Sequence, residues 1–106
     1  MQVDLGGIKH LSEIATQCRA AFSDLIAHCV TSYYVYTKSY TNDDFAPVCG
    51  NDQVCPRLFT GNQATDNLDL VVVNTFDWLI AARYVRLNPQ SWVNLVSMRW
   101  ELYGCD

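Results

Sequence analysis

Residues 68–87 read LDLVVVNTFDWLIAARYVRL, a strongly apolar stretch within a chain of 106 residues. Wound as a helix, this stretch has almost no polar face, and a helix of that kind is covered on most sides in a folded protein. We therefore expect residues 68–87 to form a buried helix that begins at Asp66 or Asn67, both good N-caps. The run of valines at 71–73 also fits a buried strand, but the length of the stretch and its lack of helix breakers favour a helix.

Two more helices are expected, one on each side of this stretch. Between residues 8 and 29 the apolar side chains recur every three or four positions, as in an amphipathic helix that continues to about residue 36 or 38. Asn88 and Pro89 combine a capping residue with a proline suited to the first helical position, which predicts a helix over 89–103.

The expected fold is therefore all-α, a small bundle of three main helices with a long irregular loop at about 42–65. Residues 30–40 are dense in β-branched and aromatic side chains, which are typical of strands. The alternative is an α+β fold with a short sheet formed by 30–40 and part of 46–73. Residues 1–106 are enough for a single globular domain, and too few for a second core.

The 42–65 loop is rich in turn formers, and residues 47–56 suit a small hairpin around Gly50-Asn51-Asp52. Cys49 and Cys55 flank that turn, and the sequence leaves open whether they pair. Their spacing is wider than that of a usual zinc-binding pair, so no metal site is predicted.

Composition points to a binding protein. Half of the residues are hydrophobic and 17% are charged, which excludes a disordered chain. An apolar surplus in so short a chain exposes apolar patches, and such patches are usually partner surfaces. The net charge is −4 and no basic patch is interleaved with aromatic residues, so nucleic acid is not an expected partner.

The expected location is the cytoplasm. Residues 1–7 have neither the basic nor the apolar region of a signal peptide, and no run of about twenty apolar residues suggests a membrane span. Without export, the five cysteines are expected to be reduced thiols, with Cys18 and Cys29 buried as small apolar residues. No membrane partner is expected.

Aromatic residues are the best candidates for contact with a partner, because tyrosine and tryptophan are enriched at interface hot spots. Together with two acids of the loop, the candidate partner-binding residues are Tyr33, Tyr34, Tyr36, Tyr40, Asp43, Asp44, Trp92 and Trp100. No catalytic residue and no cofactor is predicted.

The function expected from the sequence is that of a non-catalytic protein-interaction module that binds a protein partner or itself, as a homodimer or other homo-oligomer. Such a module suits a small inhibitor or adaptor from a phage or mobile element. The alternative is a small-ligand-binding domain with an aromatic-lined pocket under the 42–65 loop.

Overall fold

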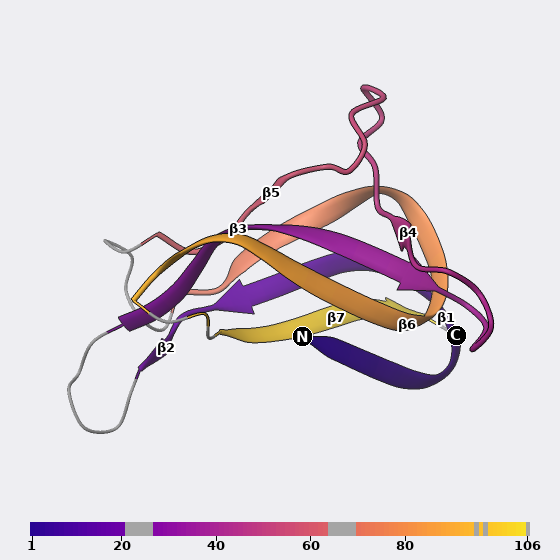
Figure 1. Cartoon of the computed structure of the whole chain (residues 1–106), viewed down its shortest axis with the longest axis horizontal. Helices are drawn as coiled ribbons and strands as arrows, with labels where there is room; N and C mark the ends of the chain where they lie inside the picture. Colours follow the sequence, from indigo (N-terminus) through magenta and orange to yellow (C-terminus); the bar gives the residue numbers. More distant parts are fainter. Residues whose placement is uncertain (21–26, 64–69, 95, 97, 106) are drawn as a thin grey trace.

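The computed structural model describes residues 1–20, 27–63, 70–94, 96 and 98–105. Every regular element in these ranges is a β-strand and none is a helix (Figure 1), so the predicted all-α bundle is wrong. The strands are β1 (Gln2–Gln17), β2 (Arg19–Ala20), β3 (Ala27–Lys38), β4 (Ala46–Pro47), β5 (Phe59–Thr60), β6 (Val72–Val93) and β7 (Arg99–Cys105).

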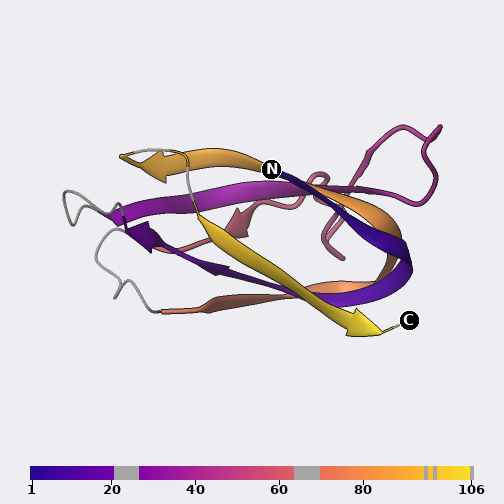
Figure 2. The same ribbon diagram turned by 90° about the horizontal axis from the view of Figure 1, so that it is seen from below.

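The strands run in the order β2-β3-β6-β1-β7, and all of the pairings are antiparallel. The long strands β1 and β6 bend part-way along their length, as Figures 1 and 2 show, and each contributes to two layers. The start of β1 pairs with the second half of β6, which pairs in turn with β3. The end of β1 pairs with the first half of β6 on one edge and with β7 on the other. The core lies between these two layers.

Residues 72–87 of the stretch that was expected to be a buried helix form most of β6. Residues 70 and 71 precede the strand, and residues 68 and 69 lie outside the described residues. Near its end the side chains alternate as in a strand: Val85 and Leu87 are buried, while Arg86 is exposed. Alternation fails in the middle because the register shifts twice between β1 and β6. The bend also leaves apolar side chains such as Trp78 and Leu79 exposed, so an apolar stretch did not mean burial on all sides.

The predicted helix over 8–29 is also wrong, and a bulge explains why the spacing looked helical. From Gln2 to His10 exposed and half-buried side chains alternate strictly. Relative to β7, a register shift between Leu11 and Glu13 then inserts an extra residue into β1. As a result Leu11 and Ile14 are both buried although they are three positions apart, which is the spacing of a helix face. Residues 21–26 of the predicted helix lie outside the described residues.

The predicted helix over 89–103 is replaced by the end of β6, a turn and β7. Asn94, with a φ of 67°, lies in the turn, while residues 95 and 97 lie outside the described ranges. Pro89 does not start a helix. It pairs with Tyr33 next to a register shift in the β3–β6 ladder, a place where a missing backbone N–H is tolerated.

Residues 30–38 do form a strand, since β3 spans Ala27–Lys38, so the predicted continuation of the first helix to about residue 36 or 38 is wrong. The α+β alternative that contained this strand is nevertheless wrong as a fold class, because the described residues contain no helix. The turn predicted at 50–52 is present: Gly50 N–H donates to the Val54 carbonyl at 2.9 Å, and Gln53 N–H donates to the Gly50 carbonyl at 3.2 Å.

Aromatic rings from three strands fill the centre of the core. Tyr33 stacks on Phe59 with ring centroids 5.5 Å apart, and Phe59 meets Phe76 edge to face at 5.8 Å. Aliphatic side chains from β1, β3 and β6 surround these rings, among them Ile14, Val35, Val85 and Leu87.

Candidate functional site

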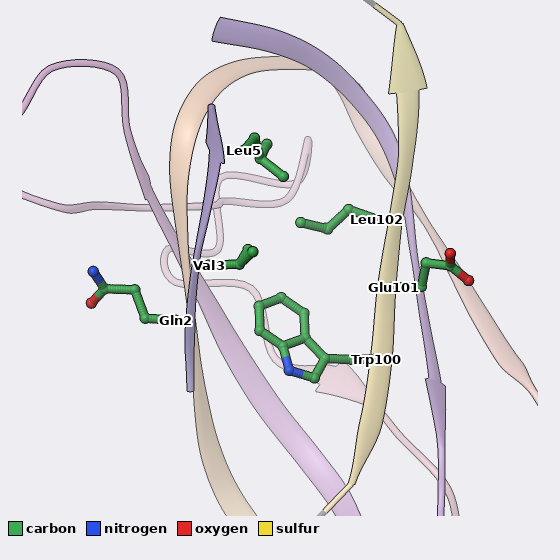
Figure 3. A pocket seen from close by; sticks show the side chains of 6 residues that line it. All are labelled: Gln2, Val3, Leu5, Trp100, Glu101 and Leu102. Atoms are coloured by element: carbon green, nitrogen blue, oxygen red, sulfur yellow. The ribbon is translucent and has the colours of Figure 1, made fainter. Parts of the chain in front are cut away.

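An open groove of about 460 Å³ lies between the start of β1 and β7. Figure 3 shows Val3 and Leu5 of β1 pointing towards Trp100 and Leu102 of β7, with Gln2 and Glu101 pointing away. The four apolar side chains are all partly buried against the core. The groove is therefore a place where the space between the two layers opens to solvent.

Two strand edges border this groove. β7 is the last strand of the sheet and pairs only with β1 among the described residues, so its other edge is free. The first residues of β1, Gln2 to Asp4, pair with β6 and with no second strand in the described ranges. Free edges present unpaired backbone N–H and C=O groups, which can pair with an added strand.

The polar groups beside the groove are exposed. On β7 the Tyr103 hydroxyl donates to the Glu101 carboxylate at 3.1 Å, and this hydrogen bond raises the pKa of Tyr103. At the other border Asp4 accepts two hydrogen bonds from Arg83, at 2.8 and 3.1 Å, and these hold the pKa of Asp4 below its usual value. Neither pair lies between the apolar side chains, so the groove floor offers shape and apolar contact rather than proton transfer.

The residues predicted to bind a partner do not form one surface. Tyr33 is fully buried in the core, which makes it a structural residue. Tyr34 and Tyr36 lie on the outer side of β3, with ring centroids 6.5 Å apart, and Tyr40 follows β3 with 65% of its surface exposed. Trp92 is half-exposed near the end of β6.

The two acids and the last tryptophan lie apart from that tyrosine group. Asp43 and Asp44 are exposed in the turn after β3, where the Asp43 carboxylate accepts the Tyr40 N–H at 3.2 Å. Of all the predicted partner-binding residues, Trp100 is the one that lines the groove.

Three groove residues were missed, and strand periodicity carries the signal that would have found them. Val3 and Leu5 alternate with polar residues in QVDLG, and Trp100 and Leu102 alternate with charged residues in RWEL. Each run is short, and Leu102 lay within the helix predicted over 89–103.

The cysteines differ from the expectation of reduced thiols. Cys18 pairs with Cys29 and Cys49 pairs with Cys55, each disulfide with a Cα–Cα distance of 4.5 Å. Cys105 is a free, exposed thiol on β7. The described parts of the chain contain no cluster of three His, Cys, Asp or Glu side chains suited to a metal ion. They also contain no helix long and apolar enough to cross a membrane.

The segment predicted to be an irregular loop at 42–65 contains the short strands β4 and β5, and residues 50–58 of it border an open hollow of about 410 Å³. An ion pair between Arg57 and Asp77 borders it, with N and O atoms 3.4 Å apart, and the turn residues Gly50 to Asp52 form its rim. Its lining contains no aromatic side chain within the described residues.

The fold and the sequence both match proteins of one family. The structure superposes on discoidin II of Dictyostelium discoideum with a TM-score of 0.74 and 26% identity, covering 99% of this chain and 36% of that one. Residues 1–102 match the sequence model of the F5/8 type C domain. The chain belongs to the F5/8 type C domain family.

Its relatives are much longer proteins. Neuropilin-1 of Xenopus laevis is 38% identical over 105 residues, which are 99% of this chain and 11% of the relative. Coagulation factor V of Bos taurus is 31% identical over 107 residues, covering 100% of this chain and 4% of the relative. The chain therefore spans only a small part of the length of these relatives.

Proposed function

We propose that this F5/8 type C domain is a non-catalytic binding module that takes an extended segment of a protein partner into the groove between β1 and β7. One observation carries this proposal: four half-buried apolar side chains line a groove whose two bordering strand edges are unpaired within the described part of the chain. An extended segment placed there pairs its backbone with β7, and every second side chain contacts Trp100, Leu102 and Val3.

A library of displayed linear peptides, panned on the oxidised chain, tests the groove. We expect the selected peptides to alternate apolar and polar residues, and to bind the Leu102→Glu variant at least about tenfold more weakly, since that change places a charge among apolar side chains. Leu79→Glu is the matched control, because Leu79 is 60% exposed on β6 and outside the groove. Equal binding by both variants would contradict the proposal.

Hydrogen exchange of the unmodified chain keeps the test independent of how well a variant folds. The β7 amides that do not pair with β1 should exchange more slowly when peptide is bound. If the peptide binds but the exchange rates of the β7 amides do not change, the peptide binds outside the groove and the proposal is contradicted. The homodimer prediction is tested by measuring the mass in solution of the unmodified chain and of Leu102→Glu. A dimer that the variant loses would mean that two copies of the chain bind through this groove.

We also propose that the domain works in an oxidising compartment, in place of the cytoplasm expected from the sequence. Two disulfides support this location, because paired cysteines persist in oxidising environments and are rare in the cytosol. Thiol blocking in the native host, followed by a thiol count, should find Cys105 alone free. Blocking of the other four cysteines as well would show that both disulfides are reduced in the host, which would contradict this proposal and favour the cytoplasm.

A further inference from the structure

A second surface lies on the outer face of the sheet formed by β1, β6 and β3, on the side opposite the core. Cross-strand register places Gln2, Arg86 and Tyr36 in one row, and Asp4, Tyr84 and Lys38 in the next. Val85 lies between Tyr84 and Arg86 on β6, Val35 precedes Tyr36 on β3, and both are buried on the inner face.

Positive charge gathers on this face although the chain is acidic. Three of the seven Lys and Arg residues of the chain lie here, namely Lys38, Arg83 and Arg86. Phe45, from the turn that follows β3, lies among them. We call Lys38, Arg83, Arg86, Phe45, Tyr84 and Tyr36 the cation–aromatic face.

Two of these cations share one aromatic ring. The Arg86 guanidinium carbon lies 4.0 Å from the centroid of the Phe45 ring, and the Lys38 ammonium lies 4.8 Å from the same centroid. Lys38 also lies 5.3 Å from the centroid of Tyr84. The rings therefore hold two like charges close together at the surface.

Neither of these two cations is neutralised. Arg83 is paired with the Asp4 carboxylate at 2.8 Å. In contrast, Arg86 donates only to the neutral side-chain oxygen of Gln2, at 3.0 and 3.2 Å, and Lys38 donates to the Thr41 backbone carbonyl at 3.1 Å. Within the described ranges no carboxylate forms an ion pair with Lys38 or Arg86.

We infer that the cation–aromatic face binds an acidic segment of a partner protein, with partner carboxylates at Arg86 and Lys38. Charge complementarity favours a negatively charged partner segment, because both cations keep free N–H donors. Hydrogen bonds from such donors to carboxylates are stronger than those between neutral groups. The flanking Tyr36 and Tyr84 favour a protein over a purely ionic ligand, since tyrosine and arginine together are typical of protein interfaces. This surface adjoins the groove between β1 and β7 at Gln2 and Asp4. Lys38 and Arg86 do not line that groove, so their substitution tests this surface and not the groove.

A glutamate-rich peptide and its glutamine counterpart test this inference on the full oxidised chain. We expect the glutamate peptide to bind, the glutamine peptide not to bind, and added salt to weaken binding because exposed charges are screened. Arg86→Gln and Lys38→Gln should each weaken binding by about three- to tenfold, the range for charged hydrogen bonds at an exposed site. Arg99→Gln is the matched control, since Arg99 is an exposed arginine on β7, and it should change affinity by less than about twofold.

Thermal unfolding of the three variants shows whether a loss of binding reflects a loss of fold. The inference is overturned if the glutamate peptide does not bind, or if Arg99→Gln weakens binding as much as Arg86→Gln does. Heparin and phosphatidylserine vesicles are run in parallel. Binding of either one through Lys38 and Arg86, without binding of the glutamate peptide, would assign the face to a glycan or a lipid and would also overturn the inference.

Discussion

The hydroxyl of Thr16 donates a hydrogen bond of 2.9 Å to the side-chain oxygen of Asn62, and both residues are about 1% exposed. The amide nitrogen of Asn62 donates in turn to the Leu70 carbonyl at 2.9 Å, while its backbone N–H donates to the Val30 carbonyl at 3.1 Å. One buried side chain thus connects the end of β1 to the chain just before β6, and its backbone reaches β3. Asn62 is well placed to hold the two layers together.

Asn62→Ala should lower the free energy of unfolding by about 2 to 3 kcal/mol, because it leaves the buried Thr16 hydroxyl and the Leu70 carbonyl without this partner. Urea denaturation measures the change. Asn88→Ala is the control: Asn88 is exposed on the outer side of β6, and its loss should cost less than about 0.5 kcal/mol. Similar losses in both variants would mean that the buried contacts of Asn62 contribute little.

Stability should fall at high pH because of Tyr33. Burial raises the pKa of its phenol from 10.0 to about 12, so the folded state holds the proton more tightly than the unfolded state does. The contribution of this group is fully present below pH 10 and is lost as the pH rises towards 12, a total of about 2 to 3 kcal/mol. Denaturant midpoints measured across this window should fall more steeply for the natural chain than for Tyr33→Phe. Parallel curves would show that Tyr33 ionises normally.

Two glycines should respond in opposite ways to the same substitution. A Cβ at Gly104 on β7 would clash with the His10 carbonyl oxygen of β1, whereas a Cβ at Gly7 meets nothing within 4 Å. Gly104→Ala should therefore destabilise the chain by about 1 to 3 kcal/mol or more through overpacking of backbone against backbone. Gly7→Ala should lie within about 0.5 kcal/mol of the natural chain, or be slightly more stable. Thermal unfolding compares the two, and equal stability would rule out the close β1–β7 approach.

The sequence indicated the strand at 30–40 only as an alternative, because the preferred prediction continued the first helix to about residue 36 or 38. Its β-branched and aromatic residues marked β3 correctly, because no bulge interrupts the alternation between Tyr33 and Lys38. In β1 the bulge after Leu11, seen in the pairing with β7, turned a period of two into a spacing of three, and this imitated a helix. Bulges depend on pairing with a distant strand, so periodicity within one segment does not reveal them.

The candidate binding residues were chosen because they are tyrosines and tryptophans, and the sequence did not show which side of the sheet each one faces. The tyrosines of β3 were chosen together, yet strand alternation sends Tyr33 into the core and Tyr34 and Tyr36 to the outer face. The groove escaped prediction because its two sides, at Val3 and Leu102, come from opposite ends of the chain. Only the topology brings β1 and β7 together.

Loss of the Cys18–Cys29 disulfide should lower the free energy of unfolding more than loss of the Cys49–Cys55 disulfide does. Both cysteines are buried, and the bridge joins the end of β1 to β3 across a sequence separation of 11. Closing a loop of that length removes enough entropy from the unfolded chain to contribute about 3 kcal/mol. The double variant Cys18→Ala, Cys29→Ala should therefore unfold at a clearly lower urea concentration than the natural oxidised chain.

The Cys49–Cys55 disulfide closes a shorter loop, with a separation of 6. The double variant Cys49→Ala, Cys55→Ala should therefore lose less stability, about 2 kcal/mol. The reverse order of the two losses would show that the 47–56 turn, and not the β1–β3 bridge, is the more important crosslink.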